Sequence, residues 1–403
     1  MADHYNNNIP LRSLLPALKN KQYFNYGGQG PLPEPALEQI TQSWKDIQKL
    51  GPFTNRVWPY IYNEINKTKK LLADICGVNT SQIALTENVT SGCVLPLWGL
   101  PLREGDQILI SNCEHPGVVA ACREIAVRQQ LKVDIVNLKD IKSGVEQKET
   151  ADISIMKRIE EKLTSKTKLV VISHILWNTG QVIPISSIGS LLKSHYNKPF
   201  FLVDGAQSFG QMPIDKDVAL TDIYAFTGHK WALGPEGLGG VALSKRVLEE
   251  SKPTLIGWRS LKNETNIEAN FINPYHLDSR RFEIATSCIP LLAGLRCSLK
   301  LLEDNGTSLE RFSKILDSSR MLWEGLGGIE SITNIIQGAP PSGLVSFSVD
   351  SKSSAKEIVS KLGESELWIR DLEDPVCLRA CVHITTTQEE IENLTKAVRK
   401  LLS

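Results

Sequence analysis

Short apolar runs, rich in β-branched and aromatic residues, alternate with longer amphipathic segments through most of the chain. We predict β-strands at six of these runs: Gln107–Ile110, Val133–Val136, Leu169–Ser173, Phe200–Val203, Ile223–Phe226 and Gly239–Leu243. Near-continuous apolar strands separated by helix-length stretches indicate an α/β fold, with a mainly parallel sheet covered by helices on both faces. Such sheets bind ligands beyond the carboxyl ends of their strands. The residues that follow each run are therefore candidates for a functional site.

The pattern changes after about Tyr275. Long helical patterns lead into short strands and a last helix, which we expect at Ile289–Asn305, Ser308–Leu326, Gly343–Ser348, Leu367–Ile369, Cys377–His383 and Gln388–Leu402. This order is typical of a smaller α+β domain, and the first twenty residues are expected to pack with it. We therefore predict a large domain over residues 22–275 and a small domain formed by residues 1–21 and 276–403. The charged, turn-rich stretch Leu138–Thr150 is expected to be a surface loop.

Composition and charge argue against several classes of protein. Lys plus Arg and Asp plus Glu each number 45 in the 403 residues, and no basic stripe carries interleaved aromatics, so we expect no nucleic-acid partner. No segment reaches the ~18 continuous apolar residues of a membrane-spanning helix, and the N-terminus does not resemble a signal peptide. The eight cysteines are scattered without CxxC pairs, which argues against a metal site and a disulfide scaffold. We expect a cytoplasmic protein.

The strongest chemical signal is Thr227-Gly228-His229-Lys230, directly after a predicted strand. A lysine at a strand end can meet an aldehyde cofactor in the crevice at the sheet edge and hold it as a Schiff base. The hydroxyl of Thr227 and the imidazole of His229 are placed to hold a phosphate. A solvated lysine after a buried strand is the commoner fate of lysines in general, so this motif needs the support of a second one.

The second signal is Asp204-Gly205-Ala206-Gln207, which begins 26 residues before Lys230 and also follows a predicted strand. Pyridoxal 5'-phosphate needs a carboxylate that keeps its ring nitrogen protonated. It also needs a small residue under the ring and a donor near the phenolic oxygen. Asp204, Ala206 and Gln207 supply these three groups in order. An isolated strand-end Asp is more often a helix cap, but the two motifs together predict a pyridoxal phosphate site.

Two further loops follow predicted strands. His115, in Cys113-Glu114-His115-Pro116, can stack on the cofactor ring and exchange protons with the substrate; a plain loop histidine in a proline turn is the alternative. In the polar turn Thr86–Gly92, the backbone amides of Val89 and Thr90 would cradle the phosphate if a helix begins there. Pro96 limits how regular that helix can be.

Together these positions resemble the class V aminotransferase-like enzymes of fold type I, the superfamily that contains cysteine desulfurases and cysteine/cystine C–S lyases. The resemblance runs from about Tyr23 to the C-terminal helix, and VDGAQ at Val203–Gln207 and TGHK at Thr227–Lys230 are its most specific pieces. It implies pyridoxal 5'-phosphate as the cofactor and a large domain with a seven-stranded, mainly parallel sheet. In RFEIAT (Arg281–Thr286) the family places a phosphate-binding threonine that reaches across a dimer interface. By this resemblance Thr286 contacts the neighbouring subunit's cofactor, which implies a homodimer; a helix N-cap is the other interpretation.

An amino-acid substrate needs a cation for its carboxylate, and the planar guanidinium of arginine matches that group. Strict alternation over residues 376–383 puts Arg379 on the polar face of a strand, and it resembles the family's carboxylate-binding arginine. Trp177, which stands where the family commonly has asparagine, and Trp258 are candidate walls of the substrate pocket; core packing is the alternative for both. Arg370 resembles a second arginine near the active site, unless it forms a surface ion pair with Asp371, Glu373 or Asp374.

One departure from the family bears on the reaction. Desulfurases carry a nucleophilic cysteine shortly after the arginine that Arg370 matches, but here the stretch Asp371–Pro375 is acidic and has no thiol. Without a thiolate the persulfide route loses its nucleophile. The sequence therefore favours a C–S lyase, resembling the cyanobacterial-type enzymes, that eliminates the sulfur of cystine or cysteine to give pyruvate, ammonia and a persulfide or sulfide for an iron–sulfur acceptor protein. The alternatives are a cysteine desulfurase that yields alanine, with Cys377 or a partner's thiol as acceptor, and an aminotransferase or epimerase.

Overall fold

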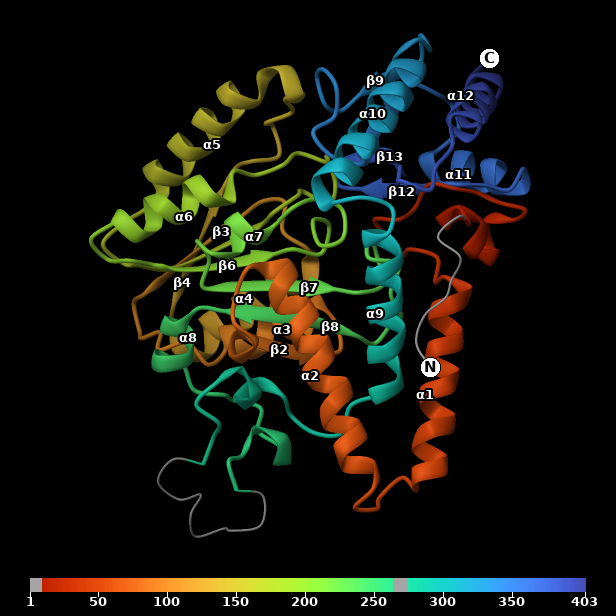
Figure 1. Cartoon of the computed structure of the whole chain (residues 1–403). Helices are drawn as coiled ribbons and strands as arrows, with labels where there is room; N and C mark the ends of the chain where they lie inside the picture. Colours follow the sequence, from red (N-terminus) through yellow and green to blue (C-terminus); the bar gives the residue numbers. More distant parts are fainter. Residues whose placement is uncertain (1–8, 264–273) are drawn as a thin grey trace.

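A seven-stranded sheet forms the centre of the computed structural model, which describes residues 9–263 and 274–403 (Figure 1). Its strand order is β2-β8-β7-β6-β5-β3-β4. The pairs among β3 to β7 are parallel, whereas β8 runs antiparallel to both of its neighbours. The strands span Ile83–Thr86 (β2), Gln107–Ser111 (β3), Lys132–Val136 (β4), Thr167–Ser173 (β5), Phe200–Asp204 (β6), Ile223–Thr227 (β7) and Gly239–Leu243 (β8).

Successive strand residues pack on opposite faces of this sheet, as the pleat requires. Val170 belongs to one buried apolar cluster together with Leu72, whereas Val171 belongs to a second cluster together with Val118. Both faces are therefore buried, which explains why the strands read as continuous apolar runs. The helices that surround the sheet are α2 (Val57–Cys76), α3 (Val89–Leu97), α4 (Pro116–Gln129), α5 (Lys148–Lys162), α6 (Ile185–Ser194), α7 (Asp215–Val218) and α8 (Lys245–Glu250).

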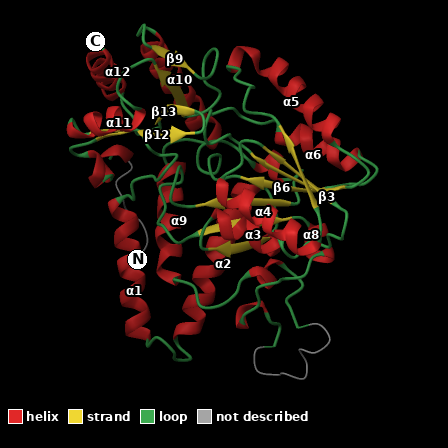
Figure 2. Ribbon diagram, turned by 180° about the vertical axis from the view of Figure 1, so that it is seen from behind, coloured by secondary structure: helices red, strands yellow, loops and turns green. Residues whose placement is uncertain are grey.

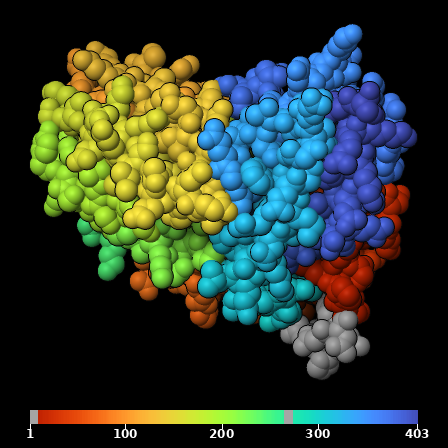
Figure 3. Space-filling model, turned by 90° about the horizontal axis from the view of Figure 1, so that it is seen from above, coloured from red at the N-terminus to blue at the C-terminus, as the bar shows by residue number. Residues whose placement is uncertain are grey.

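The C-terminal residues form a second, antiparallel sheet of four strands in the order β12-β13-β10-β9. These residues (blue in Figure 3) lie at one side of the molecule, and in Figure 2 the strands β9, β12 and β13 lie on the opposite side of the view from α5 and α6. A short parallel pair joins β1 (Gln22–Tyr23) to β11 (Leu367–Trp368). The remaining elements are β9 (Ile332–Asn334), β10 (Leu344–Val349), β12 (Arg370–Glu373), β13 (Val376–Cys381), α10 (Ser308–Gly327), α11 (Ala355–Glu364) and α12 (Gln388–Leu402).

Helices α1 (Glu34–Leu50) and α9 (Ile289–Glu303) stand side by side, next to the large sheet and below the C-terminal part in Figure 1. An added Cβ at Gly294 of α9 would lie 2.6 Å from Ile40 of α1, so the two helices approach closely at this glycine. Leu295 of α9 joins the apolar core of the large sheet. The N-terminal segment is tied to the C-terminal part, because Arg12 donates two hydrogen bonds of 2.8 Å to the carboxylate of Glu390.

The predicted fold is confirmed: a mainly parallel sheet lies beside a smaller α+β part, and the predicted strands agree with the structure to within a few residues. The prediction of a surface loop over Leu138–Thr150 is wrong in part. Leu138 and Ile141 are buried in the core, and α5 already begins at Lys148. The apolar side chains hidden among the charges of this stretch explain the error. No helix in the described ranges is both long and apolar enough to cross a membrane.

Candidate active site

Asp204 and Lys230 meet beyond the carboxyl ends of β6 and β7. Asp204 is the last residue of β6, and its buried Oδ1 accepts a hydrogen bond of 2.8 Å from the backbone N–H of Ala206. Burial raises the pKa of Asp204, while the hydrogen bond from Ala206 and the charges of Lys230 and His115 lower it. The turn thus holds a carboxylate at the sheet edge with a neighbouring cation to favour its ionised form.

Lys230 lies in surroundings that favour its neutral amine. Burial lowers the pKa of Lys230 to about 8; the charge of Asp204 opposes this effect, and the charges of Arg379 and Arg370 add to it. The backbone around Lys230 is covered by the N-terminal loop, because the N–H of Gly30 donates a hydrogen bond of 2.7 Å to His229 O. An added Cβ at Gly30 would lie only 2.1 Å from Lys230 O, so this contact requires glycine.

The expected phosphate ligands lie around the end of β7. Thr227 Oγ1 and His229 Nδ1 are 2.8 Å apart and hydrogen-bonded. Burial is the main cause that lowers the pKa of His229. A helix does begin after the polar turn, since Val89 and Thr90 are the first residues of α3, and Asn88 caps it by accepting a hydrogen bond of 2.9 Å from the N–H of Ser91.

This capped helix end lies next to Thr227. An added Cβ at Gly239 would lie 3.1 Å from Asn88, and Gly239 is the register partner of Thr227. The amides of Val89 and Thr90 thus begin a helix beside the Thr227 hydroxyl, an arrangement suited to an anion. Their contact with a phosphate stays a prediction.

His115 is the N-cap residue of α4, and its charge lowers the pKa of Asp204. Its Nδ1 accepts a hydrogen bond of 3.2 Å from the N–H of Gly117, so the neutral ring carries its proton on Nε2. Burial lowers the pKa of His115, while the charge of Asp204 raises it. The ring of Trp177 lies 6.2 Å from the His115 ring at an interplanar angle of 62°. Trp177 therefore borders His115, while its other side packs against Leu372 and Cys377.

Arg379 is buried in β13 and contacts the backbone of Trp177. Its Nη1 donates a hydrogen bond of 2.7 Å to Trp177 O, and its Nη2 donates one of 3.4 Å to Asn25 Oδ1. Its Nε is also buried, and no described residue accepts a hydrogen bond from it. A buried guanidinium with an unused donor has capacity left for a carboxylate.

Arg370 is exposed in β12 and pairs in register with Arg379. Among the described residues it forms none of the ion pairs considered from the sequence: the carboxylate of Asp374 instead lies 2.6 Å from Lys139 Nζ. The charge of Arg370 nevertheless reaches the site, since it lowers the pKa of both Lys230 and His115. The charges of both arginines thus act on Lys230.

Gln207 has more partners than the sequence indicated. Its Nε2 donates a hydrogen bond of 2.9 Å to Gly27 O, and its Oε1 accepts one of 2.9 Å from Trp231 Nε1. The amide thereby ties the N-terminal loop to the segment that follows Lys230. One N–H of the Gln207 amide remains for a cofactor oxygen, and that contact stays a prediction.

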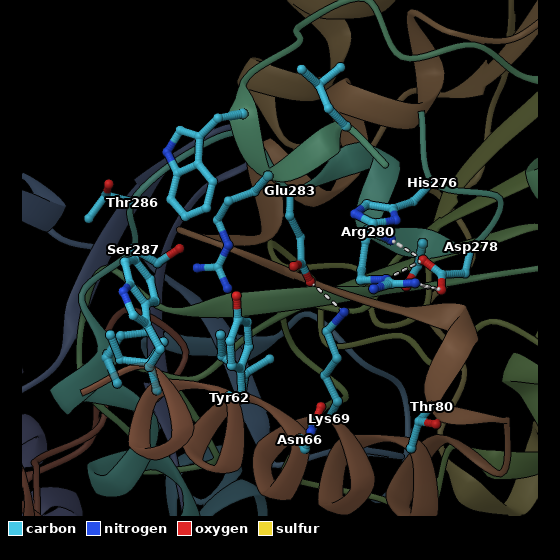
Figure 4. A pocket seen from close by; sticks show the side chains of 18 of the residues that line it. Tyr62, Asn66, Lys69, Thr80, His276, Asp278, Arg280, Glu283, Thr286 and Ser287 are labelled. Carbon is cyan, nitrogen blue, oxygen red and sulfur yellow. Dashed lines mark hydrogen bonds and ion pairs between the residues drawn. The ribbon is translucent and has the colours of Figure 1, made fainter. Parts of the chain in front are cut away.

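Trp258 and Thr286 lie elsewhere in the chain, in a cavity of about 930 Å³ whose lining includes neither Lys230, Asp204 nor His115 (Figure 4). Lys69 of α2 reaches into this cavity and pairs with Glu283 at 2.6 Å. Trp258 lines this cavity, and its expected place in the substrate pocket stays a prediction. Thr286 is not the N-cap of α9, because that position is Cys288. Its expected contact with a neighbouring subunit's cofactor stays a prediction.

Cys377 is a buried residue of β13, the strand in which the sequence predicted it. Burial raises the pKa of its thiol to about 11, which keeps it protonated and a poor nucleophile at neutral pH. The turn between β12 and β13 consists of Asp374 and Pro375 and has no thiol. No described group of three or more His, Cys, Asp or Glu residues has the arrangement of a metal site.

Comparison with known proteins defines the class of this site. The model of the class V aminotransferase family matches residues 23–394, and the chain belongs to this family. These enzymes depend on pyridoxal phosphate, so the predicted cofactor is confirmed. The site fits pyridoxal phosphate, because the buried carboxylate of Asp204, the amine of Lys230 with its lowered pKa and the capped N-terminus of α3 lie at one edge of the sheet.

Two solved structures of C-DES are similar over nearly the whole chain. The complex between the cystine C–S lyase C-DES and its reaction product cysteine persulfide is 39% identical, with a TM-score of 0.88, and covers 96% of this chain and 99% of its own. A C-DES variant with glycine covalently linked to the PLP cofactor is 38% identical, with a TM-score of 0.90 and coverages of 97% and 99%. A probable cysteine desulfurase of Pyrococcus abyssi (strain GE5 / Orsay) is 23% identical over 97% of both chains.

Three features of the site were missed by the sequence interpretation: the loop Asn25–Gly30, the buried carboxylate of Glu114 and the indole of Trp231. The loop carries a signal, since Gly27, Gly28 and Gly30 stand close together between two apolar stretches, and such spacing is typical of close backbone approach. Ser173 lies 59 residues from Glu114, and Gln207 lies 24 residues from Trp231, whose indole donates to it. No local pattern encodes them.

Proposed function

We propose that this protein is a pyridoxal phosphate-dependent carbon–sulfur lyase, which eliminates the sulfur of cystine or cysteine and leaves pyruvate and ammonia. The observation that carries the proposal is the β12–β13 hairpin. It carries two arginines whose charges act on Lys230, but its turn has no thiol, and the nearest cysteine in sequence, Cys377, is buried in the strand. The site can therefore bind an amino-acid carboxylate, while the turn of this hairpin offers no thiolate to receive sulfur.

The cofactor, when bound, supplies the electron sink that makes the α-proton of an amino acid acidic. The residues of this chain supply the rest. Asp204 holds a negative charge for the ring nitrogen, and Arg379 and Arg370 attract the substrate carboxylate. The neutral amine of Lys230, favoured by a pKa of about 8, removes the α-proton.

His115 is suited to protonate the departing sulfur, because its Nδ1 is engaged by Gly117 and its proton is on Nε2. A sulfur that leaves as a stabilised anion departs more easily. A disulfide substrate, which leaves as a persulfide, is therefore preferred over free cysteine. The persulfide would supply sulfur to an acceptor protein of iron–sulfur cluster assembly in the cytoplasm.

A homodimer is part of this proposal. The cavity that holds Thr286 is bordered by exposed apolar side chains, among them Phe53, whose surface is 83% exposed, and Tyr62, at 54%. Exposed aromatic groups around one cavity support a protein interface. We place Thr286 of each chain at the cofactor phosphate of the other chain.

The second candidate is a cysteine desulfurase, which the Pyrococcus relative favours. The two candidates differ in the fate of the sulfur, so Cys377→Ala and mass spectrometry of the protein after turnover separate them. We expect Cys377→Ala to turn over cystine as the wild type does, and the wild-type chain to carry no covalent sulfur. A persulfide on Cys377 together with loss of turnover in Cys377→Ala would instead establish the desulfurase.

A further inference from the structure

Glu114 is a buried carboxylate in the loop that carries His115. It has no role in the reaction described above. Its Oε1 accepts a hydrogen bond of 2.5 Å from Ser111 Oγ and one of 3.0 Å from the N–H of Ser173, and its Oε2 accepts one of 2.7 Å from Ser173 Oγ. Only 6% of the surface of Glu114 is exposed. Three donors on one buried carboxylate form a fully satisfied set, which is costly to disturb.

These bonds join the ends of two neighbouring strands. Ser111 is the last residue of β3 and Ser173 the last residue of β5. Ser173 is also the register partner of Asp204. Glu114 therefore fixes the loop that leaves β3 against the strand next to the Asp204 carboxylate. The residue that follows Glu114 in this loop is His115.

The imidazole of His115 is held on its other side by α4, because its Nδ1 accepts a hydrogen bond from the backbone N–H of Gly117. Two anchors thus enclose one imidazole: the Glu114 carboxylate before it and the first turn of α4 after it. The second anchor sets the tautomer, while the first sets where the ring stands relative to β5 and β6. Groups that orient a reacting side chain are conserved parts of a site's geometry in many proteins, and small displacements of the reacting group are costly.

We propose that Glu114 is a positioning residue of this active site, which holds His115 in place by tying its loop to the ends of β3 and β5. Its use in catalysis rests on the proposed function, but the positioning itself does not. Burial raises the pKa of Glu114 to about 7, and the hydrogen bonds from Ser111 and Ser173 oppose this effect. A glutamine side chain can keep its carbonyl oxygen at the Oε1 position, where it accepts from Ser111 Oγ and the N–H of Ser173, while its NH2 donates to Ser173 Oγ in place of Oε2.

The first test reads the position of His115 without any turnover. The pKa of His115 is measured by NMR on the cofactor-free protein, and the resonance is identified by its loss in His115→Gln. The charged groups that face His115 are Asp204 from β6, Lys230 after β7 and Arg370 from β12. Burial now lowers the pKa of His115. Release of the loop in Glu114→Ala should therefore raise this pKa toward its ordinary value of about 6.5.

The loss of a negative charge and the displacement of the ring would shift the His115 pKa in opposite directions. Loss of a nearby negative charge alone lowers the pKa of a histidine, so a purely electrostatic role of Glu114 would lower the His115 pKa in both Glu114→Ala and Glu114→Gln. We expect it to rise in Glu114→Ala and to stay unchanged in Glu114→Gln. Glu390→Ala, which removes another buried carboxylate that holds Arg12, should leave the His115 pKa unchanged. Any other pattern overturns the proposal.

Kinetics give a second readout. A misplaced His115 should lower kcat by about 10- to 100-fold in Glu114→Ala, with a smaller change in KM, and Glu114→Gln should restore most of the loss. If Glu114→Ala does not fold, Ser173→Ala removes only one of the three hydrogen bonds and should give a smaller shift of the same sign in the His115 pKa. An unchanged pKa there overturns the proposal. A wild-type protein that forms no pyruvate, with the NMR pattern as expected, would overturn the proposed function alone.

Discussion

Arg370 and Arg379 stand opposite each other across the β12–β13 hairpin as register partners. One is exposed, whereas the other is buried and donates to Trp177 O at 2.7 Å. Both charges lower the pKa of Lys230. Two like charges on paired strands repel each other, and a bound carboxylate between or beside them would relieve this repulsion. The hairpin is therefore built to receive an anion.

The two arginines should respond differently to substitution. Arg370→Ala should raise KM for cystine about 10-fold, as expected for one charge-assisted contact, and leave the melting temperature unchanged. Arg379→Ala should raise KM and also lower the free energy of unfolding by about 1–3 kcal/mol, because Trp177 O loses its buried donor. Kinetics and denaturant titration of both variants check this. Equal loss of stability in both would contradict the assignment.

The amine of Lys230 should govern how fast cofactor-free protein takes up pyridoxal phosphate. The attacking species is the neutral amine, and its pKa of about 8 predicts a rate that rises with pH up to about 8 and is level above it. Asp204→Asn removes a charge that raises this pKa, so its curve should shift to lower pH. Stopped-flow absorbance measures both curves. A wild-type rate that still rises steeply at pH 10 would mean an ordinary, solvated lysine.

Gly30 should be essential for a different reason. An added methyl group would lie 2.1 Å from Lys230 O, so Gly30→Ala must displace the backbone that carries the lysine. We expect kcat to fall by about 100-fold. Gly328→Ala is the matched control, since the nearest atom to its added Cβ lies at 3.6 Å and its φ is −79°. Normal activity of Gly30→Ala would show that the N-terminal loop does not support Lys230.

His383 should make the stability of the protein sensitive to acid. Its two ring nitrogens lie 3.1 Å from Thr385 Oγ1 and 3.2 Å from Trp231 O, and burial lowers its pKa from 6.5 to about 3. Because the pKa of His383 is lower in the folded than in the unfolded protein, the contribution of neutral His383 to the free energy of unfolding is fully present above pH 6.5. It is lost progressively as the pH falls toward 3. The difference in unfolding free energy between wild type and His383→Gln should shrink by up to ~1.4 kcal/mol per pH unit below 6.5. Chemical denaturation at pH 7 and pH 5 tests this, and a constant difference would contradict it.

The fold was predictable because its central strands are buried on both faces, which leaves continuous apolar runs such as Leu169–Ser173. Asp204 and Lys230 were predictable for a related reason: each directly follows such a run, and parallel strands bring their carboxyl ends to one edge. Chemistry attached to strand ends can thus be inferred from the local sequence.

Other parts of the site depend on contacts between distant segments. The bond between Gly30 and His229 joins residues about 200 positions apart, and the contacts of Glu114 depend on the register of β3 against β5. Arg370 was assigned from the family resemblance rather than from its surroundings. Trp258 illustrates the limit, because an aromatic residue in a loop signals burial against some partner but not which cavity it lines.

Product analysis of the purified protein with cystine, and separately with cysteine, tests the proposed lyase most directly. Pyruvate and ammonia should form in equal amounts, faster from cystine than from cysteine, and Lys230→Ala should form neither. Alanine with protein-bound persulfide or sulfide would contradict the account, because it would show that sulfur is removed by a thiol and not by elimination.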